Sequence, residues 1–216
     1  MIHPTTFLVE LQYLPPLEYF AGIIQHDELL IESQETFQKQ TYRNRCYING
    51  ANKIQPLSIP VKKGSQQLNI REVEINNRES WCKEHWRSIQ SAYGKAPFFE
   101  FYADFLQTLY SNPPVSLFEF DLNLLTICLQ LLNIKRKIKF TTEFKKEYKE
   151  NNITDARSRI LPNKRTLESP YYEFFTYHQV FDKNFVENLS IIDLIFCLGP
   201  QAETTLAQSV RNKKQT

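Results

Sequence analysis

The amino-acid sequence predicts an α/β fold, in which an N-terminal strand-helix-strand crossover leads into a mixed sheet flanked by helices. Two apolar strand-like runs enclose a helical segment at the start of the chain. Shorter strand-like segments joined by turn residues follow, and then come several helical segments with apolar faces. With 216 residues, the chain is long enough for one sizeable core and short for two full domains.

The opening segment has the pattern of a strand, a helix and a second strand. Residues 6–11 are largely apolar, a Pro-Pro pair precedes a helix that opens with residues 17–24, and residues 28–32 form the second apolar run. Strands joined by a helix are usually parallel. The turn at residues 12–15 is therefore expected at a carboxyl edge of the sheet, where ligands commonly bind.

The middle of the chain predicts antiparallel strands. Residues 42–48, 54–61 and 68–75 have strand-like composition, with a turn at 49–52 and a loop at 62–67. The sequence leaves open whether these strands join the first sheet or form a separate one.

Three helices are expected next, over residues 81–93, 98–110 and 117–132, followed by a strand at 134–140. The third helix is nearly all apolar, which implies deep burial. A charge run and a basic, irregular stretch then favour a loop or lid. The expected organisation is an α/β core at 1–140, a basic loop or lid at 141–170, a C-terminal strand (177–181) and helices at 171–207 that complete the same domain, and a disordered tail at 208–216.

Composition narrows the class of protein. The 26 Lys and Arg nearly balance 24 Asp and Glu, which argues against broad nucleic-acid binding. The four cysteines form no CxxC pair, and no leader-like or membrane-spanning apolar run is evident, so a cytoplasmic protein with reduced thiols and no membrane partner is expected. The common glycine-rich nucleotide-binding fingerprints are absent from the sequence.

The segment around Arg43 and Arg45 is the most informative stretch for a ligand site. Alternation along a strand places these two guanidiniums on one face, and guanidinium groups suit carboxylate or phosphate. Arg45 is also the expected partner of Glu10 if that carboxylate is buried. The opposing interpretation is that both arginines are solvated charges on an edge strand.

Other candidate residues have a competing structural explanation. His85 suits proton transfer, but a helix histidine beside an aromatic ring is more often a packed one. Cys82 and His85 supply half of a zinc site with no matching second half, so no metal site is predicted. The capping position of Asp193 explains this residue without a ligand. The basic loop with Arg157 and Lys164 is predicted either to close over an anion or to be solvated.

Taken together, several segments resemble the WbqC-like protein family, and they follow the family's order over nearly the whole chain. They are Tyr-Leu-Pro-Pro-Leu-Glu-Tyr-Phe at 13–20, Asn-Arg at 44–45, Leu-Ser-Ile-Pro-Val-Lys-Lys at 57–63, the stretch 85–99, and Asn-Leu-Ser-Ile-Ile-Asp-Leu-Ile-Phe at 188–196. The resemblance implies a bacterial cytoplasmic protein associated with surface-polysaccharide or O-antigen synthesis. It implies no particular reaction and no known cofactor.

The chain departs from the family pattern at two places. Val9, Glu10 and Leu11 stand where the family has His-Gln-Pro, and Ser33 and Gln34 replace an acidic pair after the second strand. The first turn therefore lacks the imidazole that most naturally binds phosphate or moves a proton. The segments Tyr-x-Pro-Pro at 13–16 and Tyr-Arg-Asn-Arg-Cys at 42–46 resemble a shorter branch of the family.

The leading functional hypothesis is binding of a nucleotide-linked sugar or another small anionic metabolite, with a transferase as the enzyme class to test. The alternative is a non-catalytic scaffold that docks a polysaccharide-assembly protein through aromatic side chains at 98, 99, 101 and 102. The residues expected to form the site are His85 as acid or base, and Tyr13, Asn44, Arg45, Lys62, Lys63, Arg157 and Lys164 as ligand-binding groups.

Overall fold

A parallel four-stranded sheet forms the centre of the protein. The computed structural model describes residues 4–77, 80–164, 169–181 and 184–210, and within them the strand order of this sheet is β5-β2-β1-β6. All three neighbouring pairs are parallel, so the four carboxyl ends lie at one edge. The strands are β1 (Thr6–Glu10), β2 (Glu28–Glu32), β5 (Lys137–Phe140) and β6 (Ile153–Asp155).

The predicted strand-helix-strand opening is confirmed. Helix α1 (Leu17–Ile24) joins β1 to β2, and the two strands pair in parallel from Thr6 opposite Glu28 to Glu10 opposite Glu32. Because the two strands are in register, the carboxylates of Glu10 and Glu32 leave the sheet side by side.

Helix α1 packs unusually close to β1 at Gly22. A Cβ atom at this position would lie 2.3 Å from Cζ of Phe7, whose ring is fully buried. Gly22→Ala is therefore expected to lower the free energy of unfolding by about 1–3 kcal/mol, as overpacking of a core does. Urea denaturation measures the loss. The double variant Gly22→Ala with Phe7→Leu is expected to lose less unfolding free energy than the two single variants lose together, because the smaller side chain makes room for the added methyl group. If the two losses are fully additive, the contact between the two residues is contradicted.

Two of the middle strands pair antiparallel, as predicted, and they form a separate sheet, which answers the question that the sequence left open. Strand β3 (Arg45–Asn49) pairs with β4 (Ile54–Ser58). The prediction of a strand at 68–75 is wrong. This stretch instead contains the 3-10 turn η2 (Ile70–Glu72), because the side chain of Asn69 accepts a hydrogen bond from the backbone N–H of Arg71 and turns the chain.

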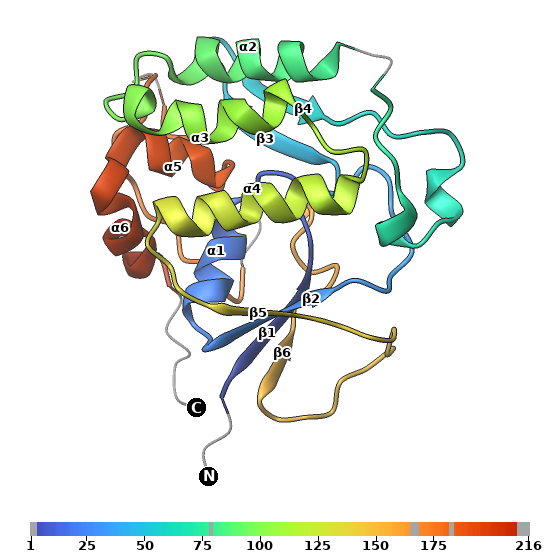
Figure 1. Ribbon diagram of the computed structural model, residues 1–216. Helices are drawn as coiled ribbons and strands as arrows, with labels where there is room; N and C mark the ends of the chain where they lie inside the picture. The colour runs from blue at the N-terminus through green and yellow to red at the C-terminus, as the bar shows by residue number, and fades with distance from the viewer. Residues whose placement is uncertain (1–3, 78–79, 165–168, 182–183, 211–216) are drawn as a thin grey trace.

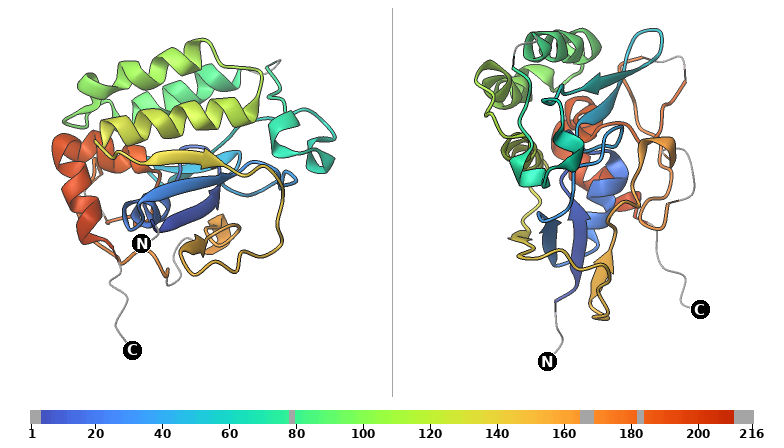
Figure 2. Two further views of the ribbon diagram at one scale, coloured as in Figure 1. Left: turned by 60° about the horizontal axis from the view of Figure 1, so that its bottom comes forward. Right: turned by 90° about the vertical axis from the view of Figure 1, so that its right-hand side faces the viewer.

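The helices form a layer over the sheets and a group at one end. Figures 1 and 2 show α2, α3 and α4 above the parallel sheet, with α5 and α6 beside them. The helix predicted at 81–93 has those bounds, the one expected at 98–110 is shifted by one residue at both ends, and the one expected at 117–132 ends one residue earlier. The bounds are α2 (Trp81–Tyr93), α3 (Phe99–Ser111), α4 (Leu117–Leu131), α5 (Ile191–Leu198) and α6 (Ala202–Gln208), with short 3-10 turns η1 (Ser65–Gln67), η3 (Pro162–Lys164) and η4 (Gly199–Gln201).

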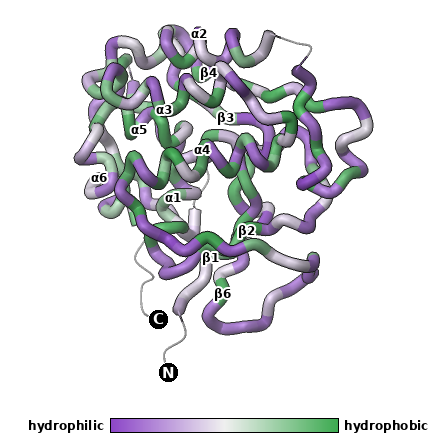
Figure 3. Tube along the Cα trace, viewed as in Figure 1, coloured by the Kyte–Doolittle hydropathy of each residue, from purple (hydrophilic) through white to green (hydrophobic). Residues whose placement is uncertain are grey.

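The segment expected as a loop or lid, 141–170, also supplies a strand of the main sheet. Strand β6 has three residues, and it pairs with β1 from Thr6 opposite Ile153. Figure 3 shows the connection between β5 and β6 as largely hydrophilic, as its composition predicts. Residues 165–168 of this segment lie outside the described residues.

The C-terminal part departs from prediction at two points. Residues 177–181 form no strand; within them, the side chain of Gln179 donates to the backbone carbonyl of Val186 and accepts from its backbone N–H. Of the tail expected to be disordered, Gln208 ends α6 and Val210 forms a bridge with Tyr172, while residues 211–216 lie outside the described part of the chain.

Apolar side chains from both sheets and from the helices form one continuous core. All four cysteines are free thiols, and three of them are buried. Among the helices of the described residues, none is long and apolar enough to cross a bilayer.

Candidate functional site

A cavity of about 820 Å3 opens at the carboxyl edge of the parallel sheet. It is bounded by the segment after β2, the connection between β5 and β6, and the residues that follow β6. Ligands of α/β proteins commonly bind at this edge, and cavities of roughly 300–1,000 Å3 suit small molecules. Its lining comprises Gln34, Glu35, Thr36, Gln38, Phe144, Lys146, Glu147, Tyr148, Asp155, Arg157, Ser158, Arg159 and Lys164.

Arg43 lies behind this cavity as a fully buried cation. Its Nε donates to Oε1 of Glu35 at 2.7 Å and a terminal nitrogen donates to Oε2 of Glu35 at 2.6 Å, which makes a two-pronged ion pair. The other terminal nitrogen is 3.9 Å from Oε1 of Glu10. Burial raises the pKa of Glu35, and the hydrogen bonds from Arg43 oppose that rise.

The fully buried Glu32 at the end of β2 forms a second ion pair with Arg157, which lies at the cavity wall. Arg157 donates from one terminal nitrogen to Oε2 of Glu32 at 2.7 Å. Its Nε and its other terminal nitrogen donate to the two oxygens of Asp155 at 2.9 and 2.6 Å. These hydrogen bonds to Asp155 are the largest cause of the raised pKa of Arg157. The carboxylate of Glu32 also accepts from the backbone N–H of Gln34 and from the hydroxyl of Thr141.

Glu10 fixes the turn that follows β6. Its Oε2 accepts the backbone N–H of Ser158 at 2.9 Å, and its Oε1 accepts from the side-chain amide of Gln12 at 3.0 Å. Ser158 has a left-handed backbone with φ of 54°, and Leu14 in the turn after β1 has φ of 41°. Non-glycine residues in this region are strained by about 1–3 kcal/mol each, and such strain is concentrated at functional sites.

Exposed cations face the cavity in front of this buried network. Lys146, Arg159 and Lys164 line it and are exposed to solvent. Of the acidic lining residues, Glu35 and Asp155 are already paired with Arg43 and Arg157, and Glu147 is exposed to solvent. The arrangement can therefore hold a small anion at its mouth, where ammonium and guanidinium groups make charge-assisted hydrogen bonds.

Two of the nominated ligand residues, Arg157 and Lys164, line this cavity. Asn44 and Arg45 do not. The side-chain amide of Asn44 donates to the carbonyl of Ile59, and Nε of Arg45 donates to the hydroxyl of Ser58, both at 2.9 Å. These two bonds tie β3 to β4 and its continuation.

The predicted partner of Glu10 was Arg45, and the structure shows Arg43 there instead. The reason is the residue at which strand β3 begins. Strand β3 begins at Arg45, so Arg43 precedes the strand and does not share its alternation. Its side chain lies with Glu10 and Glu35, while that of Arg45 lies on the β3-β4 hairpin.

Tyr13 and His85 meet in the core, away from the residues that line the cavity. The Tyr13 hydroxyl hydrogen-bonds Nδ1 of His85 at 2.9 Å and the hydroxyl of Tyr110 at 2.5 Å. The imidazole packs edge-on against Trp81 and also contacts the backbone of Ser58. Burial lowers the pKa of His85 to about 4, so this ring is neutral at physiological pH.

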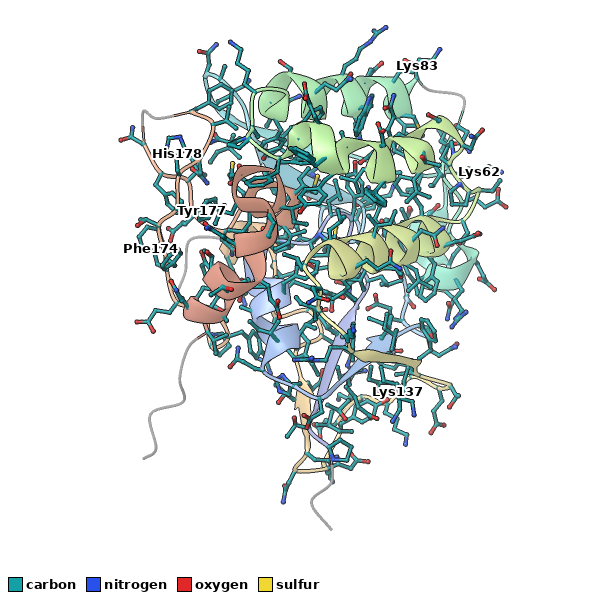
Figure 4. All side chains as sticks on the ribbon, turned by 60° about the vertical axis from the view of Figure 1, so that its left-hand side comes forward. Lys62, Lys83, Lys137, Phe174, Tyr177 and His178 are labelled. Atoms are coloured by element: carbon teal, nitrogen blue, oxygen red, sulfur yellow. The ribbon has the colours of Figure 1, made fainter. Side chains whose placement is uncertain are left out.

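The remaining nominated residues are surface lysines. Lys62 and Lys63 are both exposed in the loop after β4, and Lys62 pairs with Glu74. Figure 4 shows Lys62 pointing outward, on the opposite side of the view from Phe174, Tyr177 and His178.

Asp193 has a different explanation from the helix cap that the sequence suggested. The side chain of Ser190 makes no capping bond. The carboxylate of Asp193 is fully buried and accepts from Tyr177 at 2.5 Å and Gln179 at 2.9 Å. Burial raises its pKa to about 6. No cluster of three or more side chains suited to a metal occurs among the residues that the structure describes.

Sequence reasoning missed Glu32, Glu35 and the central position of Arg43. One signal was available. Two predicted parallel strands each end in glutamate, and parallel pairing brings such side chains together at the ligand-binding edge.

Comparisons with known proteins place the chain in one family. The model of the WbqC-like protein family matches residues 12–170 and 162–205. Rv1507c of Mycobacterium tuberculosis, described as an uncharacterized protein, is 34% identical over 104 residues. These residues are 48% of this chain and 45% of that protein, so the chain spans about half the length of this curated relative. No solved structure matches. Because the family model covers most of the chain, the protein belongs to the WbqC-like protein family.

Proposed function

We propose that this protein binds a small anionic metabolite in the cavity at the carboxyl edge of its parallel sheet. One observation carries the proposal: three exposed cations, Lys146, Arg159 and Lys164, line a cavity in which Glu35 and Asp155 are paired with arginines, so that these cations outnumber Glu147, the further acidic group of the lining. An incoming anion thus meets cations without displacing a buried ion pair. Glu10 of the buried network holds the backbone of Ser158, which precedes Arg159 in the chain.

The biological setting we propose is cytoplasmic synthesis of surface polysaccharide or O-antigen, which the family resemblance suggests. A nucleotide-linked sugar fits that setting because its diphosphate supplies the negative charge. A transferase would hold such a donor by its phosphates at the sheet edge. The proposal gives His85 no part as acid or base, since the imidazole is enclosed in the core and its pKa is about 4.

The double variant Arg159→Ala with Lys164→Ala is expected to weaken binding of pyrophosphate and of a nucleotide-linked sugar by about tenfold or more, because two charge-assisted contacts are lost. Isothermal titration calorimetry measures the affinity. The matched control, Lys53→Ala with Lys95→Ala, removes two exposed cations that do not line the cavity. Equal losses in both variants would mean that net charge, rather than this cavity, attracts the anion.

A non-catalytic docking protein is the second candidate function, and exposed phenylalanines on α3 favour it. Phe101 is 70% exposed and Phe105, one turn later, is 54% exposed. They lie beside the acidic Glu100 and Asp104, so the fitting partner is a protein surface with apolar and basic groups. Phe99 is buried and does not belong to this patch.

A thermal-shift screen with nucleotide sugars, amino acids and phosphates separates the two functions. Stabilisation by an anion that depends on Arg159 and Lys164 supports the cavity. The docking function is favoured if no small anion raises the melting temperature and a partner that binds the wild type is lost in Phe101→Ser with Phe105→Ser.

A further inference from the structure

We infer that the anion held in this cavity is a nucleotide, whose base stacks on Phe144 while its phosphate meets the cations. This inference rests on the proposed function and narrows the ligand to anions that carry a planar heteroaromatic ring.

Phe144 is the exposed phenylalanine in the lining of this cavity. Its side chain is 58% exposed, although it lies in a strongly charged stretch of the β5-β6 connection. An apolar ring gains nothing from solvent exposure, and aromatic side chains commonly line the cavities that bind small molecules.

Arg157 holds this ring from one side. The guanidinium carbon lies 5.3 Å from the ring centroid of Phe144 and 5.0 Å from that of Tyr148. Asp155 and Glu32 already fix Arg157 through three of its hydrogen bonds. A cation above the ring is attracted to its π face. The Phe144 ring is thus oriented before any ligand arrives, and its exposed surface remains available for stacking.

The rest of the lining supplies groups for the other parts of a nucleotide. Lys146, Arg159 and Lys164 are cations for the phosphate. The side chains of Gln34 and Gln38 can donate to and accept from the edge of a base. Aromatic stacking with a base tolerates any of the common bases, since each has a π face. A sugar phosphate without a base leaves Phe144 without a role.

The test compares nucleoside monophosphates with ribose 5-phosphate, which has the same phosphate and sugar but no base. Calorimetry on the wild type is expected to show at least one of AMP, GMP, UMP and CMP binding about tenfold tighter than ribose 5-phosphate. Phe144→Ala is expected to remove this difference and to leave ribose 5-phosphate binding unchanged. Phe144→Trp, which retains a stacking surface, is expected to preserve it.

The outcomes separate this inference from the proposed function. If ribose 5-phosphate and every nucleotide bind equally well, base stacking is wrong and anion binding stands. If Phe144→Ala keeps the preference for nucleotides, another group holds the base and the assignment to Phe144 is wrong. If the wild type binds neither class nor pyrophosphate, both proposals fail. Because Phe144 is exposed, both variants are expected to fold as the wild type does, and an unchanged melting temperature verifies this.

Discussion

Replacing Arg43 with methionine is expected to lower the free energy of unfolding by about 3–5 kcal/mol, the largest loss that we expect from a single substitution in this site. The guanidinium is fully buried between the carboxylates of Glu35 and Glu10. Methionine replaces the aliphatic part of arginine but has no guanidinium, so Glu35 loses both of its hydrogen bonds from Arg43 and two acidic groups remain together without that cation. Urea denaturation at neutral pH measures the loss.

Two further variants make this result specific. Arg45→Met removes a guanidinium two residues away that bonds only the hydroxyl of Ser58 in the described structure, and it is expected to cost about 1 kcal/mol or less. Adding Glu35→Gln to Arg43→Met removes a charge that has lost its partner, and it is expected to restore part of the stability. If Arg43→Met and Arg45→Met have equal effects, the buried network does not stabilise the protein in this way.

The elements that sequence reasoning located well are those with local signals. Strand β2 is an apolar run with the predicted bounds, and α2 has the predicted bounds because an amphipathic pattern begins just after Ser80 and ends before Gly94. Such signals depend only on residues that are close in the sequence, so they can be recognised without knowledge of the fold.

Strand β6 could not be found in this way. Ile153 to Asp155 is short and half-buried, and it is a strand because β1 offers it hydrogen-bonding partners from the opposite end of the chain. The prediction of a strand at 68–75 was wrong for the opposite reason. Its β-forming residues are interrupted by a local turn, in which the side chain of Asn69 accepts a hydrogen bond from the backbone. Non-local pairing and side-chain competition for the backbone override composition in both cases.

The candidate site shows the same division. The basic composition of the 141–170 segment left two interpretations of Arg157 and Lys164 open, a loop that closes over an anion or solvated charge, and both residues line the cavity. The choice between Arg43 and Arg45 depended on the residue at which β3 begins, which composition does not give. Because β3 begins at Arg45 rather than at Tyr42, the buried arginine is Arg43 and not the predicted Arg45.

Acidification is expected to destabilise the wild type relative to His85→Gln, because the buried imidazole resists protonation. His85 has a pKa of about 4 in the folded protein and about 6.5 in the unfolded chain. Above about pH 6.5 the imidazole is neutral in both states and contributes no pH dependence. Between about pH 6.5 and about pH 4 the unfolded chain binds the proton and the folded protein does not, so stability falls as the pH falls.

The relative loss is expected to reach about 2.5 kcal/mol between about pH 7 and about pH 4.5. The comparison with His85→Gln is needed because Asp193 acts in the opposite direction. Its pKa of about 6 in the fold exceeds its ordinary value of 3.8, so the folded protein takes up that proton first and stability rises as the pH falls through this interval. Asp193 is present in both proteins and cancels in the difference. Denaturation curves of the two proteins at a series of pH values give that difference directly, and parallel pH profiles would show that His85 is protonated in the fold as readily as in the unfolded chain.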